Sequence, residues 1–293
     1  MQVRSMIVLD LLVAVLAWAG VAHADPSAKD LTLCGKNEFF FSKVLPREND
    51  EARKVKYRVL LPKNFNSSYK YSVVYYLHGR DSDRWALEGL GVCESMNALI
   101  DSGKTPFIII APDGGTTYWM NAAGKNERWG DVITHELVGD VDSKYPTIAS
   151  PEGRLLSGIS MGGHGTFQLN LNFPGIFGAL AAHSPAFRTE KEALKEFPLQ
   201  FGAGQDFKDR DPFSLMQEAG KRLHIPIWMD IGAKDDWFKN TKRMAEYLKE
   251  IGYTGELHIG EDFDGAHELS YWKKHLPEYL DWYSKHLRSP VKE

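Results

Sequence analysis

The stretch Gly158-Ile159-Ser160-Met161-Gly162-Gly163-His164-Gly165 contains the pattern G-x-S-x-G between a short apolar run and a helical pattern. In this pattern the serine sits on a strained turn from a strand into a helix, because glycines two residues before and after it let the neighbouring backbone approach without a Cβ clash. The N-terminus of the following helix points free N–H groups toward the serine, which favours an oxyanion there. Ser160 is therefore the candidate nucleophile.

The residues around this stretch decide between two interpretations, a nucleophile turn and a glycine-rich turn with an incidental serine. Arg154-Leu155-Leu156-Ser157 is typical of the end of a buried strand. After the stretch, apolar residues continue up to Pro174, where a helix would stop: Phe167, Leu169, Leu171 and Phe173. A strand, a turn and a helix in this order are the setting that the motif requires, so the context favours the nucleophile.

Strand-like and helix-like segments alternate along the rest of the chain. Continuous apolar runs at 71–77 and 107–111 are typical of strands buried on both faces of a parallel sheet. Further strands are predicted at 31–46, 55–62, 178–182, 225–231 and 256–259, and helices between 129 and 146, at 238–251 and at 269–286. This alternation predicts one α/β domain with a mostly parallel central sheet and helices on both faces. Residues 187–223 are less periodic and are expected to form a small cap or a loop excursion.

The first 24 residues have the features of a secretory signal peptide. Arg4 gives a basic start, residues 7–21 are mostly apolar, and Ala22-His23-Ala24 is a small-x-small cleavage site. Asp10 interrupts the apolar run, which is also short for a membrane-spanning helix. We therefore expect residues 1–24 to be cleaved, residues 25–293 to form a single secreted or periplasmic domain, and no stable membrane insertion.

Charge and cysteine content narrow the range of partners. Lys and Arg number 35, Asp and Glu 39, and they are mixed along the chain for a formal net charge of −4. There is no basic stripe for a nucleic acid and no polybasic patch for a membrane, so a small or uncharged molecule is the expected partner.

Cys34 and Cys93 either form one disulfide in an oxidising compartment or remain two separate buried thiols. No cysteine cluster or paired-histidine spacing indicates a metal site, and nothing in the sequence indicates the oligomeric state.

A serine hydroxyl needs a histidine to accept its proton and a carboxylate to orient that histidine. With a nucleophile on this kind of turn, the acid and then the histidine follow later in the chain. His267 lies in a loop between the last predicted strand and the last predicted helix. The other late histidines fall inside a strand or on that helix: His258, His275 and His286. His267 is therefore the candidate base.

The acid is expected just after a strand, because sites in open α/β sheets gather at the carboxyl edge. The strand 225–231 runs into Gly232-Ala233-Lys234-Asp235-Asp236, which places two carboxylates past that edge. Asp235 is the preferred acid and Asp236 is the alternative. The aspartate that is not the acid would be a solvated turn carboxylate or a helix N-cap.

A developing oxyanion needs two backbone N–H donors. One is expected from Met161, the residue after the nucleophile. The other is expected from the loop after an early strand, where Leu77-His78-Gly79-Arg80 lets Arg80 turn its N–H inward. His78 is expected to support this loop by packing rather than to take part in the chemistry, and His164 is likewise expected to be structural.

Several segments together resemble the serine esterases of the α/β-hydrolase superfamily, which include S-formylglutathione hydrolases, feruloyl and acetylxylan esterase domains, tributyrin esterases and mycolyltransferases. The matching segments are Tyr76-Leu77-His78-Gly79, Ala111-Pro112-Asp113-Gly114-Gly115, residues 158–163, Phe173-Pro174 with Phe177, the turn from Gly232 to Asp235, and Gly265-Ala266-His267 with Trp272. The resemblance implies the α/β-hydrolase fold and hydrolysis of a carboxylic ester or thioester through an acyl-serine intermediate, without metal or organic cofactor. Ala266 departs from the pattern, because relatives often carry a second glycine there.

The expected substrate is a small-molecule or polysaccharide-linked ester with a short or phenolic acyl group. Tyr118, Trp119 and Trp237 are candidates for an aromatic mouth around it, or else they pack loops together. No long apolar lid segment is evident, which disfavours a lipase, and the signal peptide argues against the intracellular S-formylglutathione hydrolase role. Two alternatives stay open: acyl transfer to an alcohol with the same residues, and a non-catalytic binding protein on this scaffold.

Overall fold

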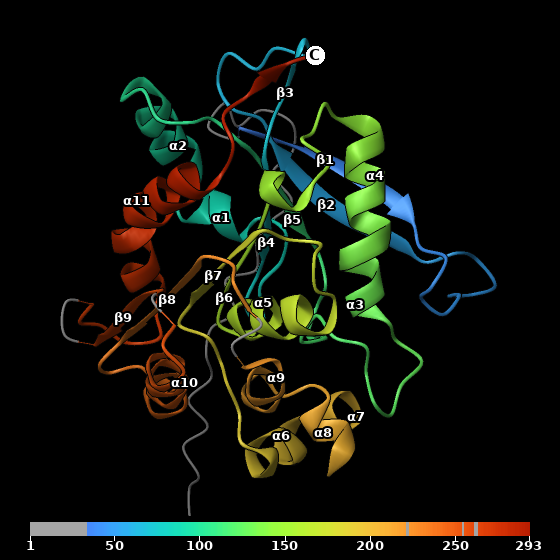
Figure 1. Cartoon of the computed structure of the whole chain (residues 1–293). Helices are drawn as coiled ribbons and strands as arrows, with labels where there is room; N and C mark the ends of the chain where they lie inside the picture. Colours follow the sequence, from blue (N-terminus) through green and yellow to red (C-terminus); the bar gives the residue numbers. More distant parts are fainter. Residues whose placement is uncertain (1–33, 221–222, 254, 261–262) are drawn as a thin grey trace, which may run out of the picture. The chain divides into compact units, whose positions relative to one another are not determined.

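A central sheet of eight strands organises the part of the chain that the structure describes (Figure 1). The computed structural model describes residues 34–220, 223–253, 255–260 and 263–293, so the predicted signal peptide at 1–24 lies outside the described residues. β1, β2 and β5 pair antiparallel, and the pairs from β5 to β9 are parallel, which confirms the predicted mostly parallel sheet. In order across the sheet, the strands are β1 (Gly35–Phe41), β2 (Lys54–Leu60), β5 (Ile108–Pro112), β4 (Val73–Leu77), β6 (Arg154–Ile159), β7 (Ala179–His183), β8 (Ile227–Gly232) and β9 (Glu256–Gly260).

Helices cover both faces of this sheet, as predicted. The main ones are α2 (Val92–Asp101), α4 (Val138–Lys144), α5 (Met161–Asn172), α10 (Phe238–Glu250) and α11 (Leu269–His286). Successive side chains of a strand point to opposite faces, so β4 contributes to two cores. Val73, Tyr75 and Leu77 pack with residues of α4 and α5, whereas Val74 and Tyr76 pack with residues of α2 and α11. Figure 1 shows α2 and α11 on one side of the sheet and α4 on the other.

The helix predicted between Trp129 and Pro146 is one helical run with a wider turn in its middle. It starts as α3 (Trp129–Asp131), continues through a π-helical segment, Val132–Leu137, and ends as α4 just before Pro146. The residues whose four-residue spacing predicts this helix are all fully buried: Ile133, Leu137 and Val141. The prediction of a buried helical face is therefore confirmed.

The segment expected to form a cap or loop excursion, 187–223, contains four short helices in its described part. They are α6 (Glu190–Glu196), α7 (Pro198–Phe201), α8 (Gln205–Lys208) and α9 (Pro212–Ala219). α6 starts with a capping box, in which Thr189 Oγ1 accepts the N–H of Glu192 and the Glu192 carboxylate accepts the N–H of Thr189. Local capping of this kind stabilises a helix too short to show an apolar periodicity.

Several short elements were not predicted. They are α1 (Ala86–Gly89), α2, the 3-10 turn Pro151–Gly153, and a two-stranded ribbon of β3 (Tyr69–Lys70) with β10 (Val291–Lys292). α2 does show helical spacing in Val92, Met96 and Leu99, which are all buried, so a local sequence signal for this helix exists. The ribbon joins two segments that are far apart in the sequence, so no local pattern indicates it.

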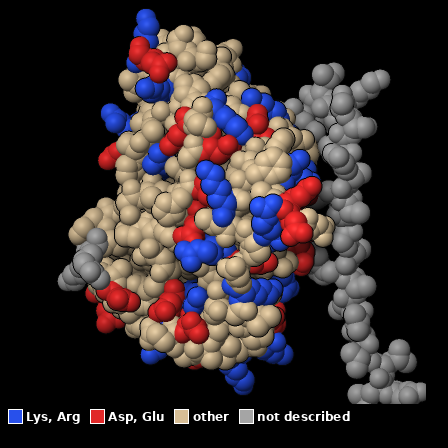
Figure 2. Space-filling view, turned by 90° about the vertical axis from the view of Figure 1, so that its right-hand side faces the viewer, with Lys and Arg blue, Asp and Glu red and all other residues tan. Residues whose placement is uncertain are grey.

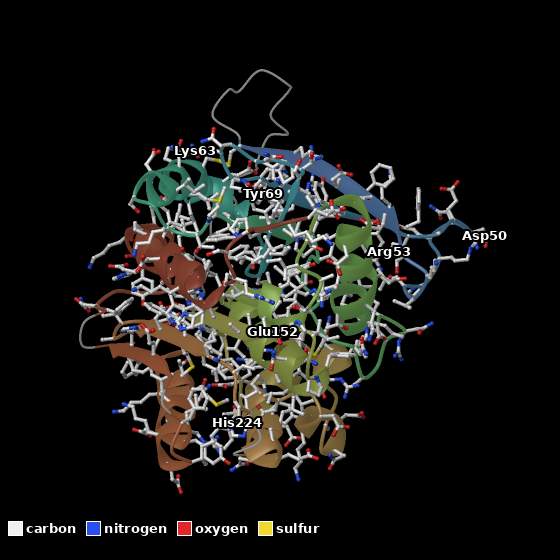
Figure 3. All side chains as sticks on the ribbon, turned by 45° about the horizontal axis from the view of Figure 1, so that its top comes forward. Asp50, Arg53, Lys63, Tyr69, Glu152 and His224 are labelled. Atoms are coloured by element: carbon white, nitrogen blue, oxygen red, sulfur yellow. A yellow bond between two sulfur atoms is a disulfide. The ribbon has the colours of Figure 1, made fainter. Side chains whose placement is uncertain are left out.

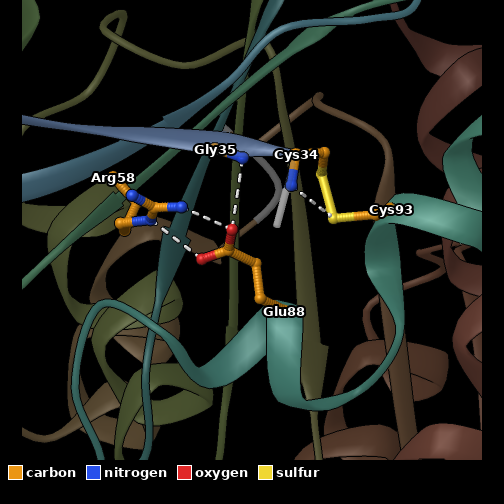
Figure 4. Close-up of a disulfide and its surroundings, with 5 residues drawn as sticks. All are labelled: Cys34, Gly35, Arg58, Glu88 and Cys93. Carbon is orange, nitrogen blue, oxygen red and sulfur yellow. Dashed lines mark hydrogen bonds and ion pairs between the residues drawn. A yellow bond between two sulfur atoms is a disulfide. The ribbon is translucent and has the colours of Figure 1, made fainter. Parts of the chain in front are cut away.

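Cys34 and Cys93 are joined by a disulfide, which decides between the two alternatives for these residues (Figure 4). The bridge ties the residue before β1 to α2. Beside it, Glu88 of α1 accepts two hydrogen bonds from the guanidinium of Arg58, at 2.5 and 2.8 Å, and one from the N–H of Gly35. Buried ion pairs are tolerated when further hydrogen bonds satisfy them, so the bridge and this pair together hold the edge of the sheet against α1 and α2.

Removing the bridge is expected to lower stability without abolishing the fold. The cysteines are 59 residues apart, and closing a loop of that size restricts the unfolded chain. The double variant Cys34→Ser, Cys93→Ser should lose about 2 to 4 kcal/mol of unfolding free energy in urea denaturation. Wild-type protein kept in reductant is the matched control, and unchanged unfolding midpoints in both samples would contradict this role of the bridge.

Candidate active site

The turn at Ser160 has the strained backbone that the motif predicts. Ser160 lies between β6 and α5 with φ 57° and ψ −115°. Glycine is required on both sides, because a Cβ at Gly158 would lie 2.5 Å from the backbone of Gly162, and one at Gly162 would collide with the carbonyl oxygen of Leu77. The N–H of Ser160 donates to the carbonyl oxygen of His183 at 2.9 Å, so the turn is held against β7.

Ser160, His267 and Asp235 form one hydrogen-bonded chain. His267 Nε2 lies 2.8 Å from Ser160 Oγ, and His267 Nδ1 lies 2.8 Å from Asp235 Oδ2. A carboxylate can only accept hydrogen bonds, so Nδ1 carries the ring proton. Nε2 is then free to accept a hydrogen bond from the serine hydroxyl. In this arrangement the imidazole can take the serine proton while the carboxylate holds its orientation.

The structure places the two neighbouring aspartates differently. Asp235 is buried, with a side chain that is 0% exposed, and its other oxygen accepts the N–H of Trp237 at 2.8 Å. Asp236 is exposed. Of the two aspartates, Asp235 is the one whose carboxylate bonds to His267.

The candidate oxyanion donors lie beside the serine. Gly79 approaches it so closely that an added Cβ would lie 3.3 Å from the Cβ of Ser160. In the described part of the chain, neither the N–H of Met161 nor that of Arg80 donates to another protein group. Both N–H groups are therefore available to a negatively charged oxygen.

The ring of His78 holds the peptide that carries the Arg80 N–H. The N–H of Gly114 donates to His78 Nε2 at 3.1 Å, so Nδ1 carries the proton and donates to the carbonyl oxygen of Gly79 at 2.7 Å. That carbonyl and the Arg80 N–H belong to one planar trans peptide and point in opposite directions, so fixing one directs the other. Burial lowers the pKa of His78, which keeps the ring neutral and this pattern of donors intact.

The three aromatic residues proposed for a substrate mouth have different environments. Tyr118 and Trp119 are 1% and 0% exposed. The hydroxyl of Tyr118 accepts from Arg188, and the indole N–H of Trp119 donates to the carbonyl of His78, so both rings pack loops together and do not line an open mouth. Trp237 is half-buried and stacks on the guanidinium of Arg188, 4.5 Å from its ring centroid. Trp237 alone of the three remains a candidate substrate contact.

His164, in the first turn of α5, is a buried packing residue. Its ring lies 5.2 Å from that of Tyr118 and 5.4 Å from that of Phe201. Burial lowers the pKa of His164 to about 3, so the ring is neutral at physiological pH. This environment supports the structural role expected for it.

A buried polar cluster behind the serine was missed by the sequence reasoning. Asp230 of β8 is fully buried, and one of its oxygens lies 2.6 Å from Nδ1 of His183, whose carbonyl holds Ser160. The other donors to Asp230 are Trp228, Tyr271 and Tyr279, at 2.7 to 2.8 Å. Burial raises the pKa of Asp230, but His183 and the other donors outweigh it and lower the pKa overall. The cluster ties β7, β8 and α11 together, and α11 follows the His267 loop directly.

Few described residues are arranged to hold a metal ion. The group of potential ligands with suitable spacing in the described ranges is Cys34, Cys93 and Glu88. The two sulfur atoms are bonded to each other and Glu88 is paired with Arg58, so these atoms do not form a ligand set.

Of the helices in the described residues, none combines the length and the apolar character needed to cross a bilayer.

Several known proteins of similar sequence or fold are named as esterases or as a related hydrolase. A family model described as "Putative esterase" matches residues 49–283. An acetyl esterase of Caldicellulosiruptor saccharolyticus is 26% identical over 197 residues, which cover 60% of this chain and 71% of the relative. An S-formylglutathione hydrolase of Paracoccus denitrificans is 24% identical over 242 residues, which cover 72% of this chain and 84% of the relative. The solved structure of a ferulic acid esterase, 21% identical, has the same fold, with a TM-score of 0.73 over 87% of this chain and 98% of that one.

Proposed function

The chain belongs to the Esterase family and is a hydrolase of carboxylic ester bonds with the α/β-hydrolase fold, and we propose that Ser160, His267 and Asp235 are its nucleophile, base and acid. The observation that carries this proposal is the hydrogen-bonded chain between them. Ser160 and His267 are 107 residues apart and His267 and Asp235 are 32 apart, yet both contacts are 2.8 Å. Such convergence of a hydroxyl, an imidazole and a carboxylate is the arrangement that activates a serine.

The proposed reaction has two halves. As Ser160 Oγ bonds to the ester carbonyl carbon, its proton moves to His267 Nε2, and the N–H groups of Met161 and Arg80 bind the resulting oxyanion. The bond to the alcohol then breaks, and His267 returns the proton to the leaving oxygen. Water repeats the attack on the acyl-serine, with His267 again as the base, and releases the acid.

We propose that the substrates are esters with a short-chain or phenolic acyl group, including acyl groups linked to carbohydrate. Two similar proteins support this class, because one is named an acetyl esterase and the other a ferulic acid esterase. The half-buried ring of Trp237 beside Asp235 offers one apolar contact for a bound group. On the face shown in Figure 2, basic and acidic residues are interspersed.

We also propose that the protein is secreted or periplasmic. The signal peptide expected at residues 1–24 is the first support for this location. The Cys34–Cys93 disulfide is the second, because such bridges persist in oxidising compartments. An exported protein would not meet a substrate that is made and consumed inside cells, so the S-formylglutathione hydrolase role is disfavoured.

A rate panel tests the proposed function. Acetyl, butyryl, octanoyl and feruloyl esters and acetylated xylan are compared at one pH. The proposal expects kcat/KM to be highest for acetyl, butyryl or feruloyl esters and to fall at octanoyl. A maximum at octanoyl would contradict the substrate class, and no hydrolysis of any ester would contradict the function. Product analysis with added glycerol separates hydrolysis from acyl transfer.

The role of His78 predicts a selective loss of rate. In His78→Ala the Gly79 carbonyl loses its donor, so the Arg80 N–H is no longer directed at the oxyanion. We expect kcat to fall about 10- to 100-fold with little change in KM, because losing a donor outright typically costs 100- to 1,000-fold. His78→Asn, which retains a donor near the position of Nδ1, should recover part of kcat. Equal losses in kcat for the two variants, or a change confined to KM, would contradict this role.

A further inference from the structure

A polar cleft lies at the same edge of the sheet as Ser160. Its volume is about 370 Å³, within the range of small-molecule sites. Its walls come from the loop after β5, the start of β2, the loop before α3 and the cap: residues 113–117, Arg53, Lys54, Lys125, Glu127 and Gln200. Arg53, labelled in Figure 3, lies beside the helical segment that begins at Trp129, with its guanidinium 5.9 Å from that ring.

The cleft is adjacent to the loop that carries the Arg80 N–H. β5, β4 and β6 are neighbouring parallel strands, so the loops after β5 and β6 are about two strand spacings apart, about 10 Å. Gly114 in the cleft wall donates its N–H to His78, whose ring holds the Gly79 peptide beside Ser160. A sugar bound in the cleft is therefore close enough to belong to the same short oligosaccharide as an ester at Ser160.

Two lysines of the cleft carry charges that no described carboxylate neutralises. Both acids of the wall already have an arginine partner: Glu127 pairs with Arg53 at 3.5 Å, and Asp113 with Arg84 at 2.9 Å. Lys54 and Lys125 are exposed and form no ion pair within the described ranges. An anionic group that enters the cleft would meet two ammonium groups that, in the described part of the chain, have no carboxylate partner to displace.

The uncharged groups of the cleft suit a sugar. The side chains of Thr116 and Gln200 make no hydrogen bond with other described residues, so they are free to bind sugar hydroxyls. Beyond Lys54, the edge strand β1 exposes Phe39 and Phe41 on one face, at 47% and 55%. The Lys54 ammonium lies 4.1 and 5.8 Å from these ring centroids, so exposed apolar surface adjoins this wall residue of the cleft.

We propose that this cleft binds a uronate-bearing carbohydrate, the alcohol part of the ester, with Lys54 and Lys125 at the sugar carboxylate. This inference rests on the proposed function, because it assumes that the ester reaches Ser160. A neutral sugar fits the same space but does not meet the two charges. The cleft therefore selects acidic over neutral oligosaccharides, and the preference weakens as salt screens the lysines.

Isothermal titration calorimetry of the full chain tests this selection without requiring turnover. The probes are an unesterified xylo-oligosaccharide with a glucuronic acid branch and the same oligosaccharide without it. At low salt we expect the acidic probe to bind about fivefold more tightly or better, from two exposed charge contacts, and the difference to shrink in 0.5 M NaCl. The double variant Lys54→Gln, Lys125→Gln should bind both probes alike. The charge-conserving variant Lys54→Arg, Lys125→Arg should keep the preference, as should Lys274→Gln, an exposed lysine on α11.

Three outcomes would overturn the inference: equal affinity of the wild-type chain for the two probes, no detectable binding of either, or a preference that survives the double glutamine variant. These failures are separate from failure of the proposed function. A chain that hydrolyses esters through Ser160 but shows no charge preference loses only the carbohydrate site. A chain that binds the acidic probe but hydrolyses no ester loses the catalytic proposal.

Discussion

Replacing Ser160 by alanine is expected to lower kcat for p-nitrophenyl acetate by about 10⁵-fold or more. The variant keeps the pocket and the oxyanion donors but has no oxygen to form the acyl intermediate, and removal of a catalytic serine elsewhere has effects of this size. The turn should still form, because its backbone is fixed by Gly158, Gly162 and the bond to His183. The measurement is the initial rate of p-nitrophenol release from purified protein.

Ser143→Ala is the matched control for this variant. Ser143 is an exposed serine of α4 whose hydroxyl donates to the carbonyl of Asp140. The control should retain the wild-type rate, which shows that losing a serine hydroxyl as such is harmless. If Ser160→Ala also turned over substrate at a rate near that of the wild type, Ser160 would have no place in the mechanism.

Replacing Asp235 by asparagine should be almost as damaging, and it separates the two neighbouring aspartates. An asparagine amide facing Nδ1 favours the wrong tautomer of His267, so Nε2 would no longer accept the serine proton. We expect a loss of about 10⁴-fold in kcat, the effect of this change in a comparable triad. Asp236→Asn should stay within about twofold of the wild type, because that carboxylate is exposed and the contact to His267 comes from Asp235.

The same p-nitrophenyl acetate assay compares these two variants under one condition. Thermal unfolding should be recorded for both, since a buried carboxylate is lost in one and an exposed one in the other. A large loss in Asp236→Asn with a small one in Asp235→Asn would reverse the assignment of the acid.

The parts of the fold predicted from sequence are those with a local signal. The buried strands β4 and β5 are continuous apolar runs, and the elbow at Ser160 needs glycine on both sides, so both are visible in a window of a few residues. The order of strands across the sheet is not local, and neither is the antiparallel addition of β1 and β2 at its edge. The ribbon of β3 and β10 is an extreme case, because its two halves pair across most of the described chain.

The residues of the site likewise divide into those that have a local sequence signal and those that do not. Chain order reduces the histidines to His267, but it cannot choose between Asp235 and Asp236, since the choice depends on which carboxylate the turn directs inward. Tyr118 and Trp119 show the limit for aromatic residues, because an aromatic loop looks alike whether it faces substrate or fills the interior. The cluster at Asp230 could not be assembled from the sequence, because its members come from β7, β8 and α11.

The central claim is that Ser160 is the residue that receives the acyl group from the ester. A fluorophosphonate probe, which bonds covalently to activated serines, followed by proteolysis and mass spectrometry of the labelled peptide, tests it most directly. We expect one adduct per chain, on the peptide that contains Ser160, and none in His267→Ala, where the hydroxyl is not activated. An adduct on a different residue, or no adduct in folded wild-type protein, would contradict the claim.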